Sequence, residues 1–198
     1  MNEEQSTGGY AIRTHIVNSK DFTETIAPEI QLALSPNGFQ RHGLLFIADH
    51  QEVTFLVSLQ KQNTTQKDRL VVSLYVSVLS KDLLKFSREK AGLPPLKPVK
   101  PKDFHWYSAH WMRNIANALG DDQGMVFWRV ESDQQALVAS KEIVTLLQDW
   151  GLPHLEGLSS TAKIAAFLRS GGGKNIADPP RQDSLKILDD LLLERLIG

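Results

Sequence analysis

Residues 53–60 read VTFLVSLQ and residues 70–78 read LVVSLYVSV, and these two stretches decide the fold. Large apolar residues stand at every second position of both stretches, and most positions between them carry serine, threonine, tyrosine or glutamine. Such period-two patterning is typical of β-strands that bury one face. The polar residues 61–68 are enough to return the chain in the opposite direction. We therefore predict two neighbouring strands of an antiparallel sheet, each with one buried face.

The rest of the chain alternates helical and strand patterns around this pair. Apolar residues at helical spacing predict a helix over 22–34, which either begins or bends at Pro28 and ends at Asn37-Gly38. Further elements are predicted as follows: a strand at 44–47, a helix at 79–88, an extended proline-rich loop at 91–103, and a strand at 125–130. Residues 104–119 fit a strand or a helix, and we favour a strand as far as Arg113.

Two serine caps begin the later helices. Ser132, with Gln135 three residues later, forms a capping box, and we expect this helix to stop at Gly151 and Pro153. Ser159 or Ser160 caps the next helix, whose Ile164, Phe167 and Leu168 would pack inward. The predicted fold class is therefore α+β, with an antiparallel sheet of about five strands and helices packed against it.

Length and composition fit one domain with extensions at both ends. We divide the 198 residues into a flexible leader at 1–18, an α+β domain at 19–170, a Gly/Pro-rich linker at 171–182 and a C-terminal helix at 183–198. The leucine stripe of that last helix must be buried, against its own domain or against a second copy in a homodimer.

Charge and hydropathy restrict the partners. A net charge of −1 gives no bulk field for nucleic acid, which makes nucleic acid an improbable ligand. No apolar run reaches the roughly 18 residues of a membrane span, and the polar first residues do not resemble a signal peptide, so a cytoplasmic protein is expected. The absence of cysteine excludes disulfides and thiol catalysis.

Four blocks of residues follow one another in this sequence: Ile26, Pro28 and Leu34; Gly38-Phe39-Gln40-Arg41 with Gly43 and Phe46; Val57-Ser58-Leu59-Gln60-Lys61; and Val72-Ser73-Leu74-Tyr75-Val76. Together these blocks resemble the bacterial domain-of-unknown-function family numbered 4304. The resemblance covers roughly residues 22–168, and it departs at Ser73, where the family more often carries asparagine. It implies antiparallel strands with helices packed against them. It implies no activity, because the family is uncharacterised.

Motifs for catalysis or cofactor binding do not occur. The segment 171–174 reads GGGK, but Leu168 stands where a phosphate-binding loop needs glycine, and Asn175 replaces its serine or threonine. None of the six histidines has a second ligand at metal-binding spacing, and no serine lies in a G-x-S-x-G motif. We therefore predict neither a metal nor another cofactor, and no catalytic residue is assigned.

Polar and aromatic residues that several strands are expected to carry out of one sheet face form the candidate binding site. The selected residues are Arg41, Gln60, Lys61, Tyr75, Trp106, His110 and Trp111, considered together with His42, Arg69 and Trp128. Rigid rings combined with hydrogen-bond donors are typical of interfaces and ligand clefts. The competing interpretation, which we rank higher, is that the tryptophans fill the core and the charges solvate strand ends.

From these patterns we predict a non-catalytic binding module with a protein partner, for example an immunity-type inhibitor of a toxin. The alternative is an enzyme or small-ligand receptor that uses a groove between sheet and helices, with Arg41, Lys61 or His110 as polar contacts.

Overall fold

The computed structural model describes residues 19–62, 70–94, 109, 111–115 and 128–170. These residues form a six-stranded antiparallel sheet in the order β1-β2-β3-β4-β5, with β6 also paired to β4. The strands are β1 (Gln40–His42), β2 (Leu45–Asp49), β3 (Val53–Gln62), β4 (Leu70–Ser80), β5 (Trp111–Asn114) and β6 (Trp128–Val130). The helices are α1 (Ser19–Leu34), η1 (Ser35–Asn37), α2 (Lys81–Lys90), α3 (Asp133–Leu146), η5 (Leu147–Gly151), α4 (Leu152–Gly157) and α5 (Thr161–Arg169).

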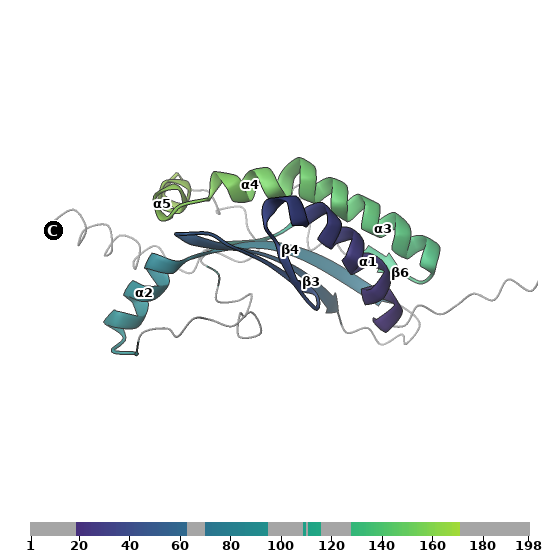
Figure 1. Cartoon of the computed structure of the whole chain (residues 1–198), viewed down its shortest axis with the longest axis horizontal. Helices are drawn as coiled ribbons and strands as arrows, with labels where there is room; N and C mark the ends of the chain where they lie inside the picture. Colours follow the sequence, from purple (N-terminus) through teal and green to yellow (C-terminus); the bar gives the residue numbers. More distant parts are fainter. Residues whose placement is uncertain (1–18, 63–69, 95–108, 110, 116–127, 171–198) are drawn as a thin grey trace, which may run out of the picture.

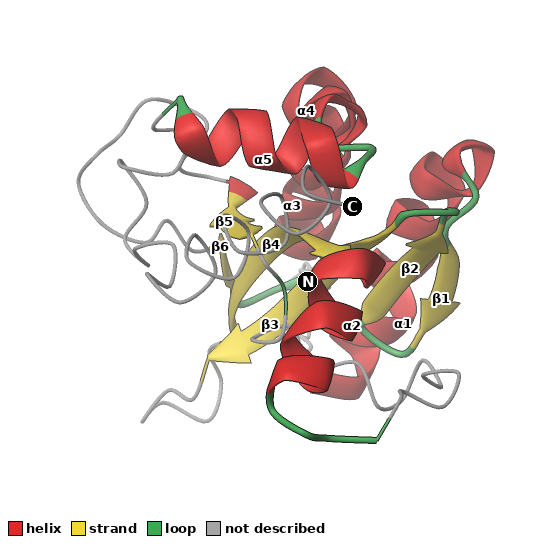
Figure 2. Ribbon diagram, turned by 90° about the vertical axis from the view of Figure 1, so that its left-hand side faces the viewer, coloured by secondary structure: helices red, strands yellow, loops and turns green. Residues whose placement is uncertain are grey.

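Helices α1, α3, α4 and α5 form a layer on one face of the sheet, and α2 continues from the end of β4 (Figure 1). Figure 2 shows the same arrangement along the sheet, with β1 and β2 on one side of the β3–β4 pair and β5 and β6 on the other. Ser140 on α3 donates a hydrogen bond to Glu29 on α1, which ties these two helices together. The α+β prediction with an antiparallel sheet is thus confirmed.

The predicted hairpin is the longest pairing in the sheet. Strands β3 and β4 pair antiparallel over ten residue pairs, from Val53 opposite Ser80 to Gln62 opposite Val71. On the helix-covered face, the odd-numbered residues of β3 meet the even-numbered residues of β4, as Val57 meets Val76, and join the main core. The main core therefore lies between this pair and the helices.

The second face of the hairpin is also buried, which makes the prediction of one buried face wrong. Ser58, Ser73 and Ser77 are buried there, beside a small apolar cluster that contains Leu56 and Leu79. Small hydroxyl residues produce the same alternating pattern as a solvent-facing strand, and the sequence therefore does not distinguish a buried polar face from an exposed one.

Strand β1 was not predicted, and it precedes the predicted first strand, which runs over 45–49 instead of 44–47. Its three residues are polar and carry no apolar alternation. They pair with β2 as Gln40 with Ile47 and His42 with Leu45. Tertiary pairing, and not a local pattern, makes this strand.

Helix α1 begins at Ser19 and passes through Pro28, so the interpretation in which the helix starts near Pro28 is wrong. Helix α2 begins at Lys81 because Leu79 and Ser80 belong to β4. The predicted end at Asn37-Gly38 is confirmed: Gly38 has a φ of 79°, a conformation that favours glycine.

The predicted stop at Gly151 and Pro153 is wrong, because the helical backbone continues from α3 through η5, a π-helical turn, into α4. Pro153 lies in the first turn of α4, where a missing N–H does least damage. Both predicted caps are confirmed. Gln135 N–H donates to Ser132 Oγ at 3.3 Å, and Lys163 N–H donates to Ser160 Oγ at 3.2 Å.

The strand interpretation holds for 111–114, and β6 supplies the end of the strand predicted at 125–130. The leader at 1–18, the linker at 171–182, the C-terminal helix at 183–198 and most of the proline-rich loop lie outside the described residues.

A chain of buried hydroxyl groups connects the end of β4 to the start of α5. Ser80 Oγ lies 2.7 Å from Thr161 Oγ1 and accepts from Leu83 N–H at 3.2 Å. Thr161 Oγ1 also lies 3.5 Å from Asp82 Oδ2, and Thr161 N–H donates to Glu52 Oε2 at 3.1 Å. Both hydroxyl protons have an acceptor if Ser80 Oγ donates to Thr161 Oγ1 and Thr161 Oγ1 donates to Asp82 Oδ2. This chain holds α2 and α5 at one end of the sheet.

We expect Thr161→Val to lower the free energy of unfolding by roughly 1 to 2 kcal/mol, because it removes the buried hydrogen bond between the Ser80 and Thr161 hydroxyl groups. Thr161→Ser keeps the hydroxyl and serves as the matched control. Urea unfolding of both variants measures the difference. Equal stability of the two variants would show that the hydroxyl chain contributes nothing.

Candidate functional site

Five side chains from four elements meet at the β5 side of the helix layer. They are Trp111 and Arg113 on β5, Trp150 on η5, His154 on α4 and Phe167 on α5, and we call them the aromatic–arginine cluster. Strand β5 pairs with β4 so that Trp111 lies opposite Val78 and Arg113 opposite Val76. Since Val76 and Val78 belong to the main core, both β5 side chains project toward the helices.

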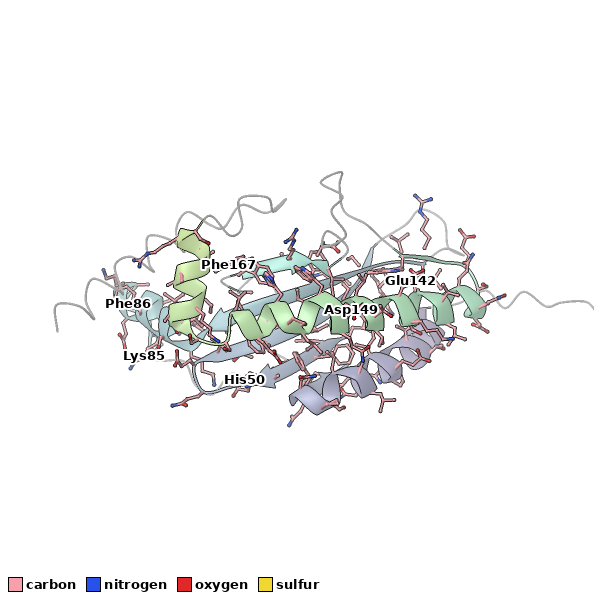
Figure 3. All side chains as sticks on the ribbon, turned by 90° about the horizontal axis from the view of Figure 1, so that it is seen from above. His50, Lys85, Phe86, Glu142, Asp149 and Phe167 are labelled. Atoms are coloured by element: carbon pink, nitrogen blue, oxygen red, sulfur yellow. The ribbon has the colours of Figure 1, made fainter. Side chains whose placement is uncertain are left out.

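The His154 ring lies between two tryptophans. It stacks on Trp150 with a centroid distance of 4.7 Å and an interplanar angle of 14°. The His154 ring also contacts the Trp111 ring, with a centroid distance of 4.6 Å and an interplanar angle of 33°. The Phe167 ring meets the Trp111 and His154 rings edge-on, with centroid distances of 6.0 and 5.4 Å. Phe167 is labelled in Figure 3, which shows this region from above the helices. Rings in such offset and edge-on contacts form a rigid surface.

Arg113 adds a positive charge to these rings. Its guanidinium carbon lies 5.2 Å from the centroid of the Trp150 ring, within the range of a cation–π interaction. Trp111 is only 3% exposed, whereas Arg113, Trp150, His154 and Phe167 are half-buried. The cluster therefore has a fixed base and a surface that solvent reaches.

A close approach at Gly151 positions the helical half of the cluster. A Cβ atom on Gly151 would lie 3.0 Å from Ile115 Cδ1, 3.3 Å from Leu147 Cδ2 and 3.5 Å from Val76 Cγ1. The missing side chain thus lets η5 lie directly on the sheet. Trp150 and His154 stand on either side of this contact, four positions apart on a helical run, which places them on the same face.

Burial and charge both act on His154. Burial lowers the pKa of His154, and the positive charge of Arg113 lowers it further. The imidazole is therefore neutral at neutral pH. Its Nε2 atom is buried and has no hydrogen-bond partner among the described residues, and the same holds for Trp111 Nε1. An unsatisfied buried polar group costs about 1 to 3 kcal/mol, so these two nitrogens are an energetic cost of the packing in this cluster.

The residues selected from the sequence do not form one site. Lys61 lies opposite Val72 and Trp111 opposite Val78, which places both on the helix-covered face but roughly 20 Å apart along β4. Gln60 lies opposite Ser73, on the other face. The hypothesis that these side chains leave one sheet face is therefore wrong, because neighbouring positions of a strand point in opposite directions.

The remaining selected residues have separate surroundings. Arg41 is half-buried, and its Nε atom donates to the Gly43 carbonyl oxygen at 3.0 Å. Tyr75 is buried on the second face, and burial lowers the pKa of Lys61. Trp106 and His110 lie outside the described residues. Only Trp111 belongs to the aromatic–arginine cluster, and its burial agrees with the interpretation that tryptophans fill the core.

Sequence reasoning missed Arg113 and His154 as site residues. The sequence predicts Phe167 only as a packing residue of its helix, and Trp150 is not among the selected residues. The spacing of Trp150 and His154 was the available signal, because residues four apart lie on one helix face. The histidine was weighed only as a metal ligand, and the neighbouring strand residue Arg113 has no local signal. Among the described residues, no group of three histidine, aspartate or glutamate side chains is placed to hold a metal ion.

Comparison with protein families gives one match. The family model described as Domain of unknown function (DUF4304) matches residues 30–157, well over half of the chain. The chain belongs to this family. Four of the five cluster residues lie within the matched part, and Phe167 lies beyond it. Neither the curated proteins nor the solved structures gave a match. In the part of the chain that the structure describes, no helix has the length and apolar character to cross a membrane.

Replacing Gly151 by alanine tests the close approach of η5 to the sheet. We expect Gly151→Ala to destabilise the protein by about 1 to 3 kcal/mol, because the new methyl group overpacks against Ile115 and Leu147. Gly157→Ala is the matched control, since a Cβ there meets nothing within 4 Å. It should stabilise by up to about 1 kcal/mol. Thermal unfolding distinguishes the two, and a neutral Gly151→Ala would contradict the close approach.

The lowered pKa of His154 predicts a pH-dependent stability. Below its unfolded pKa, near 6.5, the unfolded chain binds a proton that the folded chain resists, so this contribution is present above about pH 6.5 and is lost as pH falls. We expect wild-type protein to lose more stability between pH 7.5 and 5.5 than His154→Gln, with a slope difference of at most about 1.4 kcal/mol per pH unit.

Urea unfolding at both pH values measures this difference. His42→Gln, at an exposed histidine on β1, is the control and should keep the wild-type dependence. An identical pH dependence of wild type and His154→Gln would contradict the prediction.

Proposed function

We propose that this protein is a non-catalytic binding module that holds a protein partner at the aromatic–arginine cluster. The observation that carries the proposal is the rigid Trp150–His154 stack, half exposed beside Arg113 and supported by the buried Trp111. Tryptophan and arginine are enriched among the residues that dominate the energetics of protein interfaces. An immunity-type protein, which neutralises a toxin by occupying it, is one form of this proposal, since occupancy requires a rigid surface and no catalytic group.

Removing the outer ring of the stack should weaken partner binding. We expect Trp150→Ala to weaken binding of a partner captured by the full-length wild-type chain by roughly 30-fold, the effect of losing a 2 kcal/mol hot spot. Trp128→Ala is the matched control. Trp128 is also half-buried, but it lies on β6, where its ring N–H donates to Glu142 Oε2 at 3.1 Å.

Affinity capture followed by mass spectrometry identifies the partner, and calorimetry with the purified partner measures the two variants. Thermal unfolding confirms that both variants fold. Retention of the partner by Trp150→Ala, or equal loss by both variants, would contradict the proposal. Failure to capture any reproducible partner would also count against it.

The second candidate is a small-ligand receptor that uses the same cluster. The unpartnered Trp111 Nε1 and His154 Nε2 favour it, because buried polar atoms are expected to meet a partner. The variant of this idea that relied on Arg41 and Lys61 is not supported by the register: Arg41 aligns with Val57 through β2, about 13 Å along β3 from Lys61. A thermal-shift screen over metabolites and nucleotides discriminates the candidates, since a ligand at a hundred times its Kd stabilises by about 2.7 kcal/mol.

A further inference from the structure

Tyr75 lies on the second face of the sheet, the one opposite the helix layer, and yet it is only 8% exposed. Its partners across the strands are Ser58 on β3 and Asn114 on β5. Its neighbours on the same face of β4 are Ser73 and Ser77. All four side chains are much shorter than a tyrosine side chain, so they cannot bury its ring. Another segment must therefore cover this face.

The described helices do not supply this cover. Helices α1, α3, α4 and α5 lie on the opposite face, and α2 leaves the end of β4 away from the strands (Figure 1). Leu84 on α2 packs against the small cluster with Leu56 and Leu79, which lies at one end of the second face. Tyr75 lies four residues, about 13 Å, before Leu79 along β4. The exposure of Tyr75 is that of one chain without partners, so the covering segment belongs to the same chain.

We propose that residues 95–108 lie across the second face, with aromatic side chains of 104–107 packed on Tyr75 and on the serine residues around it. This segment joins α2, which touches one end of the face through Leu84, to β5, whose Asn114 lies beside Tyr75. Fully extended, it reaches about 46 Å. The five strands from β1 to β5 span only about 19 Å. The segment is thus long enough to cross the face, and both of its ends lie next to it.

The chemistry of this segment suits the position. Residues 104–107 read FHWY, and Leu96 and Val99 add two aliphatic side chains between the prolines. The small side chains of Ser58, Ser73 and Ser77 leave room for a large ring to approach the sheet beside Tyr75. Pairs of aromatic rings in offset or edge-on contact are favourable beyond the area that they bury.

The other segments outside the described residues are placed less well to reach Tyr75. Residues 1–18 precede α1 and residues 171–198 follow α5, and both helices lie on the opposite face of the sheet. Residues 63–69 carry no apolar side chain. Residues 116–127 follow Ile115, which belongs to the main core, so this segment leaves β5 on the helix-covered side.

Proton NMR of the full-length chain tests this contact through nuclear Overhauser effects, which report protons in direct contact. The chain has three tyrosines, and the ring signals of Tyr75 are identified by their loss in Tyr75→Leu. We expect Overhauser effects between the Tyr75 ring and aromatic protons of residues 104–107. Contacts of the Tyr75 ring with residues 1–18 or 183–198 in their place would overturn the proposal.

Nitration by tetranitromethane measures the accessibility of Tyr75, and mass spectrometry of the peptide that contains it gives the rate. We expect the double variant Phe104→Ala with Trp106→Ala to raise this rate at least tenfold while thermal unfolding shows that it folds. Trp128→Ala is the matched control, because Trp128 pairs with Val72 on the helix-covered face, and it should keep the wild-type rate. An unchanged rate in the double variant would contradict the proposal.

Two further measurements separate this cover from its rivals. Deletion of residues 183–198 should leave Tyr75 protected, and exposure of Tyr75 by this deletion alone would assign the cover to the C-terminal segment. Protection that falls on dilution of the protein would assign it to a second copy of the chain. If the double variant does not fold, the Overhauser contacts of the wild-type chain decide the question. With residues 95–108 in place, the second face is not a surface that a partner can reach.

Discussion

The register of the β3–β4 pair is the constraint on which the rest of the structure depends. Ten residue pairs fix it, and because side chains alternate between faces, a slip of one residue would exchange the two faces completely. In the observed register, valine and leucine side chains meet the helix layer, while serine, threonine and tyrosine fill the opposite face. Burial of the apolar set is the dominant favourable contribution, and it is available in this register only.

The same alternation of side chains determines which face the β5 residues of the aromatic–arginine cluster occupy. Trp111 and Arg113 face the helices because their partners on β4, Val78 and Val76, do so. The helical residues of the cluster, Trp150 and His154, are positioned by Gly151, whose missing side chain lets η5 pack on Val76 and Ile115. The π-helical turn η5 joins α3 to α4, and such turns are frequent at functional sites. Two buried nitrogens have no hydrogen-bond partner among the described residues, which is an energetic cost of this packing.

The features that the sequence predicted are those set by local chemistry. The alternation at 53–60 and 70–78 predicts the hairpin, and Ser132 and Ser160 predict two helix starts, because capping needs only neighbouring residues. Gly151 and Pro153 are local stop signals that tertiary packing overrides. The candidate site was mostly missed for the same reason: Arg113 meets Trp150 only through strand pairing and helix packing, which no spacing along the chain records.

The edges of the sheet limit how another molecule can attach to it. At one edge, β1 offers three residues, Gln40–His42, all polar. On the other side of the hairpin, β4 divides its pairing between β6, opposite residues 70–72, and β5, opposite residues 75–78. Within the described residues, each of these outer strands has at most four residues, too few to template a long backbone ladder. Strand addition is therefore a mode of recognition that the described part of this sheet disfavours.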